Sequence, residues 1–228
     1  TVSSDAMGTL VFAGEGGSSA QAGINTTAAG DVWDLFDGRA GADSKMKESS
    51  SSNNMFTYTL PSMVDGLSVS ASYVPAAGND ESDTSYAFTY TGVEGLTASY
   101  GVGSNDDASG STSNADATTM SLAYAYGPVT VAYSDHEYDS NTATEDQDVT
   151  SFKVSYTVSD AISISYGEEE VESGTAGDQD AKYSRISTSY TAGGMTVSGN
   201  MSEMENGDFS TTASMDEEYV GLSVSFAF

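Results

Sequence analysis

The chain has 228 residues, which is enough for one large β domain or two small domains. Its 34 acidic residues outweigh 6 Lys and Arg, and the net charge of −28 excludes a nucleic-acid-binding surface, because such surfaces are basic. Cysteine is absent, which also excludes disulfides and thiolate metal sites. The 14 Tyr and 8 Phe, set in regular alternation, argue against disorder. No apolar run is long enough for a transmembrane helix.

The N-terminal part of the chain predicts one strand and then a long irregular segment. The strand covers Gly8 to Ala13, and residues 14–53 follow it with little alternation. Segments of this length inside a domain are usually functional or disordered. It contains an apolar and aromatic cluster around Trp33, Leu35 and Phe36. The segment is therefore either a surface loop with an anchoring patch, or a loop folded into a tube and held to the wall by these three side chains.

From Met55 onward the sequence predicts a series of hairpins. Short turns recur at Asp65-Gly66, Glu94-Gly95, Gly127-Pro128, Ser159-Asp160 and Gly193-Gly194. Segments with period-2 alternation flank each turn. Twelve strands are expected, over residues 8–13, 55–60, 67–74, 86–91, 96–103, 119–126, 129–137, 152–158, 161–167, 184–191, 195–202 and 219–228.

The two faces of these strands differ in chemistry. In the last strand Leu222, Val224 and Phe226 share one face, and Ser223 and Ser225 share the other. Elsewhere the apolar face carries tyrosines in two rows with aliphatic residues between them, which is typical of the aromatic girdles of a membrane barrel. The opposite face is small and polar, as expected for a water-filled lumen. A soluble β-sandwich would have no reason to sort its tyrosines into two rows.

Long acidic connections lie on the side opposite the tight turns, over residues 76–83, 104–116, 139–148, 168–180 and 203–216. Short turns at one end and long loops at the other are typical of outer-membrane barrels, and the unequal repeat lengths argue against a solenoid. Asp80, Glu81 and Asp83 offer oxygen ligands for Ca²⁺ or Mg²⁺. The alternative is a solvated, mutually repelling surface without metal.

Four stretches resemble the general trimeric porins of Gram-negative outer membranes, especially the branch found in photosynthetic and marine α-proteobacteria. They are residues 8–14, similar to the strand before the family's constriction loop; 31–38, similar to the core of that loop; 58–61 with 66–73, similar to the next hairpin; and 221–228, similar to the closing strand with its terminal aromatic residue.

This resemblance implies an antiparallel up-and-down transmembrane β-barrel forming a single domain over residues 1–228. Family barrels have sixteen strands, so the twelve expected here imply that four N-terminal strands precede this sequence, or else that a smaller barrel is complete at twelve. Phe228 corresponds to the C-terminal aromatic residue that the insertion machinery of the family reads. The implied partners are the lipid bilayer, lipopolysaccharide, small solutes and ions, and two further copies in a homotrimer.

The resemblance also places the constriction in the segment 14–53. The residues assigned to it are Glu15, Asp31, Asp34, Asp37 and Arg39. On the wall, Lys153 and Arg185 are the visible inward-facing basic residues. Because acidic groups in a pore favour cations, we expect a diffusion channel that prefers cations over anions.

An enzyme is not expected. The single histidine, His136, has Asp135 and Glu137 as strand neighbours that point to the other face, so these residues cannot form a proton relay. His136 is predicted to be a polar residue at the rim. Two other functions stay open: an acidic soluble or surface-layer β protein that binds calcium through its loops, and a barrel that acts as an anchor with a blocked lumen.

Overall fold

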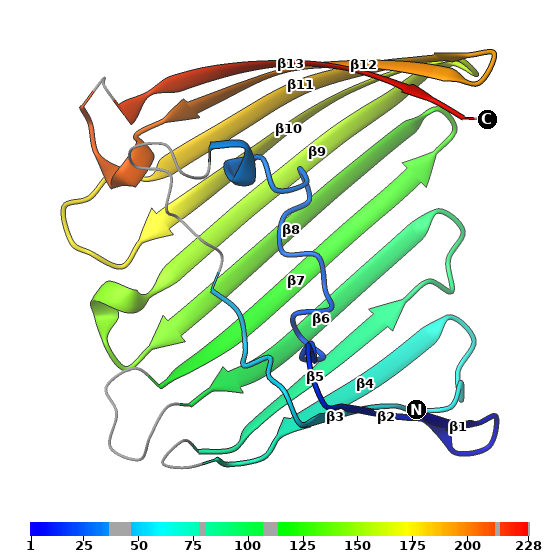
Figure 1. Ribbon diagram of the computed structural model, residues 1–228, viewed down its shortest axis with the longest axis vertical. Helices are drawn as coiled ribbons and strands as arrows, with labels where there is room; N and C mark the ends of the chain where they lie inside the picture. Colours follow the sequence, from blue (N-terminus) through cyan, green and yellow to red (C-terminus); the bar gives the residue numbers. More distant parts are fainter. Residues whose placement is uncertain (37–46, 78–80, 107–113, 213–214, 228) are drawn as a thin grey trace.

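The computed structural model describes residues 1–36, 47–77, 81–106, 114–212 and 215–227. The described chain forms one antiparallel sheet of thirteen strands, in which every strand pairs with its neighbours in sequence. The sheet is curved, and a long connection from its N-terminal edge crosses the concave face (Figure 1). Within the described residues no ladder joins β13 to β1 or β2. The all-β antiparallel architecture is confirmed.

Most strands on the C-terminal side are ten to thirteen residues long, about the length that crosses a bilayer at a tilt. The strands are β1 (Val2–Ser4), β2 (Gly8–Ala13), β3 (Met55–Thr59), β4 (Leu67–Val74), β5 (Asp83–Tyr90), β6 (Leu96–Asn105), β7 (Ala115–Tyr126), β8 (Val129–Ser140), β9 (Gln147–Ser159), β10 (Ile162–Ser173), β11 (Ala181–Ala192), β12 (Met195–Glu205) and β13 (Glu217–Phe226). Among the residues that the structure describes, the connections contain three short 3-10 turns, η1 (Trp33–Phe36), η2 (Ala143–Glu145) and η3 (Gly207–Phe209).

The expectation of twelve strands was wrong by one, because β1 precedes the first expected strand. Val2, Ser3 and Ser4 pair with the first residues of β2 through a tight turn, closed by the Met7 N–H donating to the Ser4 carbonyl at 3.2 Å. Three residues are too few to show an alternation in the sequence. The long connection therefore follows the second strand and not the first.

The boundaries at the loop end were also wrong. Glu168 to Glu170 were expected to open a loop but lie inside β10, where Glu169 pairs with Ser151 of β9 and Tyr183 of β11. Likewise Asp139 lies in β8 and Asp148 in β9. The hydrogen-bonded ladders continue through these residues because Asp139, Asp148 and Glu168 occupy the exposed face of their strands, whereas Glu169 is buried on the inward face.

The convex face is apolar and open. Leu222 and Val220 of β13 are 78% and 73% exposed, and most large apolar side chains of β2 to β12 on this face are also exposed. Tyrosines stand opposite the first residues of the rising strands at the tight-turn end: Tyr90 at Leu67, Tyr124 at Leu96, Tyr156 at Val129 and Tyr190 at Ile162. No described helix is long and apolar enough to span a membrane.

The concave face holds the largest cluster of buried apolar side chains in the described part of the chain. Its members come from the long connection and from β9 to β12: Ala29, Val32, Phe36, Val149, Val171, Ala181, Tyr183 and Met204. A one-layer sheet has no second sheet to pack against. The buried core is consequently the contact between this connection and the wall.

Candidate functional site

The connection between β2 and β3 forms the candidate site, and we call residues 14–53 the inner loop. It runs over the concave face across β5 to β10 before it returns (Figure 1). The structure describes its outgoing limb, residues 14–36, and the end of its returning limb, residues 47–53. Asp37 and Arg39, two of the predicted constriction residues, lie outside the described residues.

Wall hydroxyls hold the outgoing limb. The Ala20 N–H donates to Ser85 Oγ at 2.8 Å and to Ser72 Oγ at 3.0 Å. Further along, the Ala28 N–H donates to Ser134 Oγ at 2.8 Å and the Ala29 N–H to Ser151 Oγ at 2.9 Å. Burying a backbone N–H without an acceptor costs free energy. These serine hydroxyls supply the acceptors that the carbonyls of a partner strand would otherwise provide.

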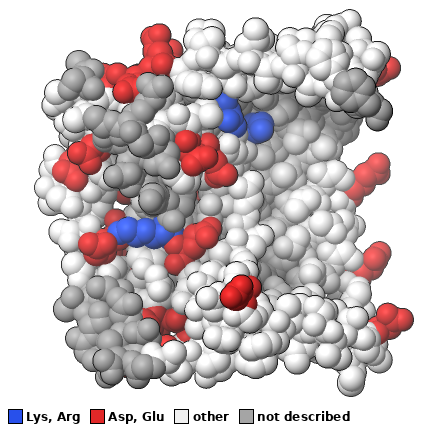
Figure 2. Space-filling view, in the orientation of Figure 1, with Lys and Arg blue, Asp and Glu red and all other residues white. Residues whose placement is uncertain are grey.

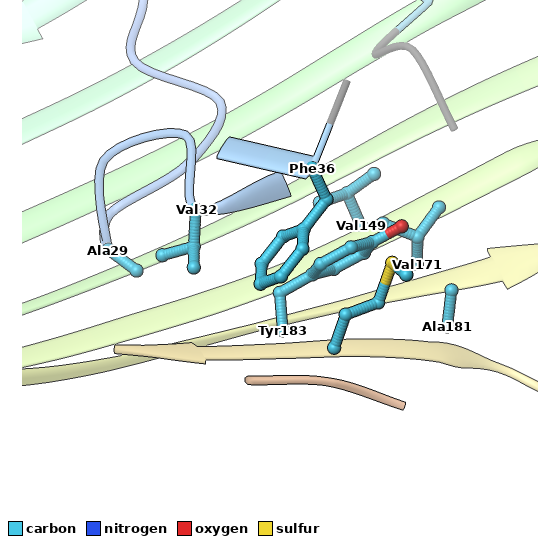
Figure 3. Packing of buried hydrophobic residues seen from close by; sticks show 8 residues of the cluster. Ala29, Val32, Phe36, Val149, Val171, Ala181 and Tyr183 are labelled. Carbon is cyan, nitrogen blue, oxygen red and sulfur yellow. The ribbon is translucent and has the colours of Figure 1, made fainter. Parts of the chain in front are cut away.

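The predicted anchor side chains lie at the far end of this limb. Phe36 is fully buried and its ring centroid lies 6.0 Å from that of Tyr183, while Val32 packs beside it (Figure 3). Trp33 and Leu35 are partly buried against the same cluster. Residues 33–36 form η1, so the chain turns here with its aromatic side towards the wall.

A buried carboxylate that the sequence analysis missed holds the start of this turn. Glu169 of β10 is 1% exposed, and its Oε2 accepts the Trp33 N–H at 3.1 Å. Its register partner Ser151 accepts the Ala29 N–H, so both residues belong to one inward row across the sheet. Alternation in the sequence places Glu169 on the inward face once β10 is known to extend through it.

The two predicted basic wall residues occupy one row of the sheet. Gly167 of β10 pairs with Lys153 of β9 on one side and with Arg185 of β11 on the other. The Arg185 guanidinium donates from Nη2 to the carbonyls of Ala29 and Gly30 at 2.8 and 2.9 Å. Arg185 therefore holds the inner loop as well as supplying charge.

Of the acidic residues assigned to the constriction, Asp31 and Asp34 are exposed on the inner loop near its contact with the wall. Asp31 accepts a hydrogen bond from the Thr27 hydroxyl. Together with Trp33 and Glu48 it lines an open pocket of about 340 Å³. Glu15 is exposed at the start of the inner loop and does not line this pocket. Sequence analysis did not single out Glu48.

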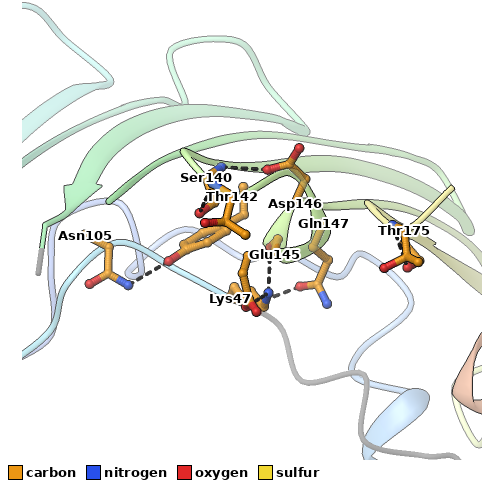
Figure 4. A network of polar contacts seen from close by, with 10 residues as sticks. Lys47, Asn105, Ser140, Thr142, Glu145, Asp146, Gln147 and Thr175 are labelled. Carbon is orange, nitrogen blue, oxygen red and sulfur yellow. Dashed lines mark hydrogen bonds and ion pairs between the residues drawn. The ribbon is translucent and has the colours of Figure 1, made fainter. Parts of the chain in front are cut away.

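The returning limb is fixed at Lys47. Its backbone N–H donates to Gln147 Oε1 at 3.0 Å, and its ammonium contacts Glu145 Oε2 at 2.9 Å (Figure 4). The pKa of Glu145 is lowered by the hydrogen bond from Lys47 and by the charge of that ammonium. The Lys47 carbonyl faces His136, which is 1% exposed on the inward face of β8. The prediction of a rim position for His136 was wrong.

The predicted metal ligands do not form a cluster in the described part of the chain. Asp80 lies outside the described residues, and no group of three or more His, Asp or Glu among the others could hold a metal ion. Asp83 is buried at 5% exposure, and its Oδ1 accepts the Asp106 N–H at 2.7 Å and the Ser104 hydroxyl at 3.1 Å. Burial and then the Asp83 charge raise the pKa of Asp106.

Charge is distributed unevenly over the concave face. Acidic side chains gather at the loop end of the sheet, and a broad uncharged surface extends from the inner loop towards the tight turns (Figure 2). Phe228 lies outside the described residues, and β13 ends at Phe226, followed by the Ala227 N–H donating to the Gly194 carbonyl at 2.8 Å.

Comparison with protein families gives one match, to a family described as Gram-negative porin, over residues 1–208. Among curated protein sequences none matches the chain.

Solved porin structures share the fold. A porin refined at 1.8 Å resolution aligns with a TM-score of 0.66 and 16% identity over 98% of this chain and 78% of its own. Salmonella typhi OmpF in complex with daunomycin gives 0.60 and 15% identity over 88% of this chain and 72% of its own. An anion-selective porin from Comamonas acidovorans gives 0.52 and 17% identity over 75% of this chain, which spans 54% of that porin's length. At these identities the likeness shows the fold alone.

Proposed function

Because the chain belongs to the Gram-negative porin family, a family of non-enzymatic outer-membrane proteins, we propose that it forms a passive channel for small hydrophilic solutes and ions. The observation that carries the proposal is the inner loop, which is bound along the polar face of a sheet whose other face is apolar and exposed. A loop in this position narrows the water-filled side and leaves the apolar side to lipid.

We further propose that the sheet is part of a closed barrel in the membrane. Unpaired N–H and C=O groups of an edge strand cost several kcal/mol each in hydrocarbon, so an open edge at β13 is not stable there. The sixteen-stranded size implied by the resemblance stays a prediction. So does the homotrimer, for which crosslinking of the detergent-solubilised protein gives the test.

Cation preference is the selectivity that the geometry supports. Asp31 and Asp34 are exposed on the inner loop, whereas the Arg185 guanidinium is engaged by two loop carbonyls. Glu15, Asp37 and Arg39 remain proposed constriction residues, and Lys153 the proposed basic residue of the wall. Carboxylates at a narrow passage raise the local concentration of cations.

The exposed apolar convex face disfavours a soluble calcium-binding protein, and it supports our proposal that lipid and lipopolysaccharide are the partners of that face. An anchor protein with a blocked lumen makes a different prediction, because it passes no current.

The proposed test is planar-bilayer recording of the purified protein under a KCl gradient. We expect stepwise conductance, and a reversal potential whose sign shows that cations permeate more readily than anions. An absence of current steps from folded protein would reject the channel.

A further inference from the structure

The two limbs of the inner loop meet at one chain of buried polar side chains. Gln21 of the outgoing limb contacts Thr119 Oγ1 through its Nε2 at 2.6 Å, and Thr119 contacts His136 Nδ1 at 2.7 Å. His136 Nε2 lies 2.5 Å from the carbonyl oxygen of Lys47 on the returning limb. Gln21, Thr119 and His136 are at most 1% exposed. We call these three residues the clasp.

The direction of each hydrogen bond in the clasp follows from the groups present. The Lys47 carbonyl can only accept, so His136 carries its proton on Nε2 and donates it there. Nδ1 is then an acceptor and receives the Thr119 hydroxyl, whose oxygen accepts from the Gln21 amide. The amide oxygen of Gln21 accepts the Ser49 N–H at 2.9 Å. Every member is satisfied with a neutral imidazole, which is the arrangement that makes a buried network rigid.

This network fixes the residues on both sides of Glu48. Lys47 is held at its carbonyl by His136 and at its N–H by Gln147, and Ser49 is held at its N–H by Gln21. The Glu48 side chain is half-buried and lines the same pocket as Asp31 of the outgoing limb. Burial raises the pKa of Glu48, and the charge of Asp31 raises it further.

We propose that the clasp positions Glu48 beside Asp31 and that Glu48 is thereby a selectivity-determining residue of the channel. This inference rests on the proposed function, because it needs ions to pass the inner loop. Two carboxylates on one pocket attract a passing cation more strongly than either alone. In the described part of the chain, the Lys47 ammonium is bound to Glu145, and the Arg185 guanidinium donates to the carbonyls of Ala29 and Gly30, next to Asp31. The carboxyls of Asp135 and Asp148 occupy convex-facing positions of β8 and β9.

The experiment measures the reversal potential of the folded protein in planar bilayers under a KCl gradient, at a series of pH values. For Glu48→Gln we expect the cation-to-anion permeability ratio at neutral pH to fall about five- to sixfold, because one unit charge about 8 Å away in water changes the cation term and the anion term by about 2.4-fold each, in opposite directions. Glu137→Gln is the matched control, since Glu137 faces the convex side of the same strand as His136. It should leave the ratio unchanged.

The clasp is tested through the pH profile. Since the pKa of Glu48 is raised, acidification of the unmodified protein should reduce cation preference at a pH above the ordinary range of a Glu carboxyl. His136→Leu removes the hydrogen-bond donor to the Lys47 carbonyl, so we expect Glu48 to move away from Asp31. The midpoint of the pH dependence of cation preference should then move to lower pH. His136→Gln keeps an N–H donor and should keep the midpoint. Thr119→Val interrupts the same chain and replaces His136→Leu if that variant does not fold.

The outcomes separate the two proposals. If Glu48→Gln leaves the permeability ratio unchanged, Glu48 does not determine selectivity. If His136→Leu and Thr119→Val fold and keep the original midpoint, the clasp does not position Glu48. If the unmodified protein conducts no ions, the channel itself is refuted and this inference with it.

Discussion

Glu169 is a buried carboxylate whose register partner on β11, Tyr183, belongs to the apolar cluster with Val171 and Phe36. Its hydrogen bond from the Trp33 N–H compensates part of the cost of removing a charge from water. Removing such a buried acceptor from a backbone N–H lowers the stability of the fold by about 1–3 kcal/mol. At the residue scale, Glu169 therefore holds the aromatic end of the inner loop.

This role predicts a change in Trp33, the only tryptophan of the chain. Glu169→Leu removes the acceptor, so we expect Trp33 to leave the wall, with red-shifted emission and stronger quenching by acrylamide. Glu169→Gln retains an oxygen acceptor and should resemble the unmodified protein. Glu170→Leu, on the convex side of the same strand, is the control. Identical Trp33 spectra for Glu169→Leu and Glu170→Leu would contradict the role.

The sequence indicated some of these residues and not others. Trp33 and Phe36 stood out because an apolar cluster in a polar segment needs something to pack against. Glu169 did not stand out, and His136 was predicted at the rim, because alternation tells which face a side chain occupies but not which distant segment lies above it. Their partners, Trp33 and Lys47, are 136 and 89 residues away in sequence.

At the scale of the elements, the inner loop and β10 approach so closely that a side chain has no room between them. A Cβ added at Gly167 would lie 2.7 Å from Ala29 Cβ and 3.1 Å from Ala29 Cα. The small inward residues of the strands are thus required for the loop contact as well as for a water-filled lumen.

We predict that Gly167→Val displaces the outgoing limb and destabilises the fold by about 1–3 kcal/mol, as overpacking usually does. Gly199→Val is the matched control, because a Cβ at Gly199 would meet only atoms at 3.9 Å. Urea titration measures the stability of both variants, and acrylamide quenching of Trp33 reports the displacement. Equal stability and equal quenching in the two variants would contradict this, because they would show that the contact between β10 and the inner loop accommodates a valine side chain.

The face assignment of the strands makes a separate prediction with arginine. Gly199 lies on the convex face of β12, between Val197 and Met201, and Ser155 lies on the concave face of β9. Gly199→Arg should hinder membrane insertion by about 2–4 kcal/mol if it lies near the bilayer midplane. Ser155→Arg should insert and shift the reversal potential towards anions. If both variants insert equally and neither shifts the potential, the two faces are assigned wrongly.

The elements were largely predictable because turn residues and period-2 alternation are local signals. Asp65-Gly66 and Glu94-Gly95 were located correctly as connections, and Gly66 and Gly95 adopt the positive φ that such turns require. β1 was missed because it is three residues long. The loop-side ends were misplaced because residues such as Glu168 and Glu170 look like loop residues, although they only occupy the convex face of a strand.

At the scale of the whole molecule, the thirteen-stranded sheet has an exposed apolar side and a polar side that carries a bound loop. In a soluble protein this arrangement would leave the apolar side in water, where it is unfavourable. In a bilayer the same side meets hydrocarbon, and the polar side encloses water. Closure of the sheet could not be predicted from alternation alone, since alternation specifies faces and not the pairing of distant edges.

The most direct test uses two neighbouring positions of β10 in a chain that has no cysteine. Ile164 lies on the convex face and Ser165 on the concave face. Each is replaced by cysteine, spin-labelled, and examined in lipid bilayers by its collision rates with oxygen, which concentrates in hydrocarbon, and with a water-soluble nickel complex. We predict that the label at Ile164 collides mainly with oxygen and the label at Ser165 mainly with nickel. Nickel access at both positions would contradict the account.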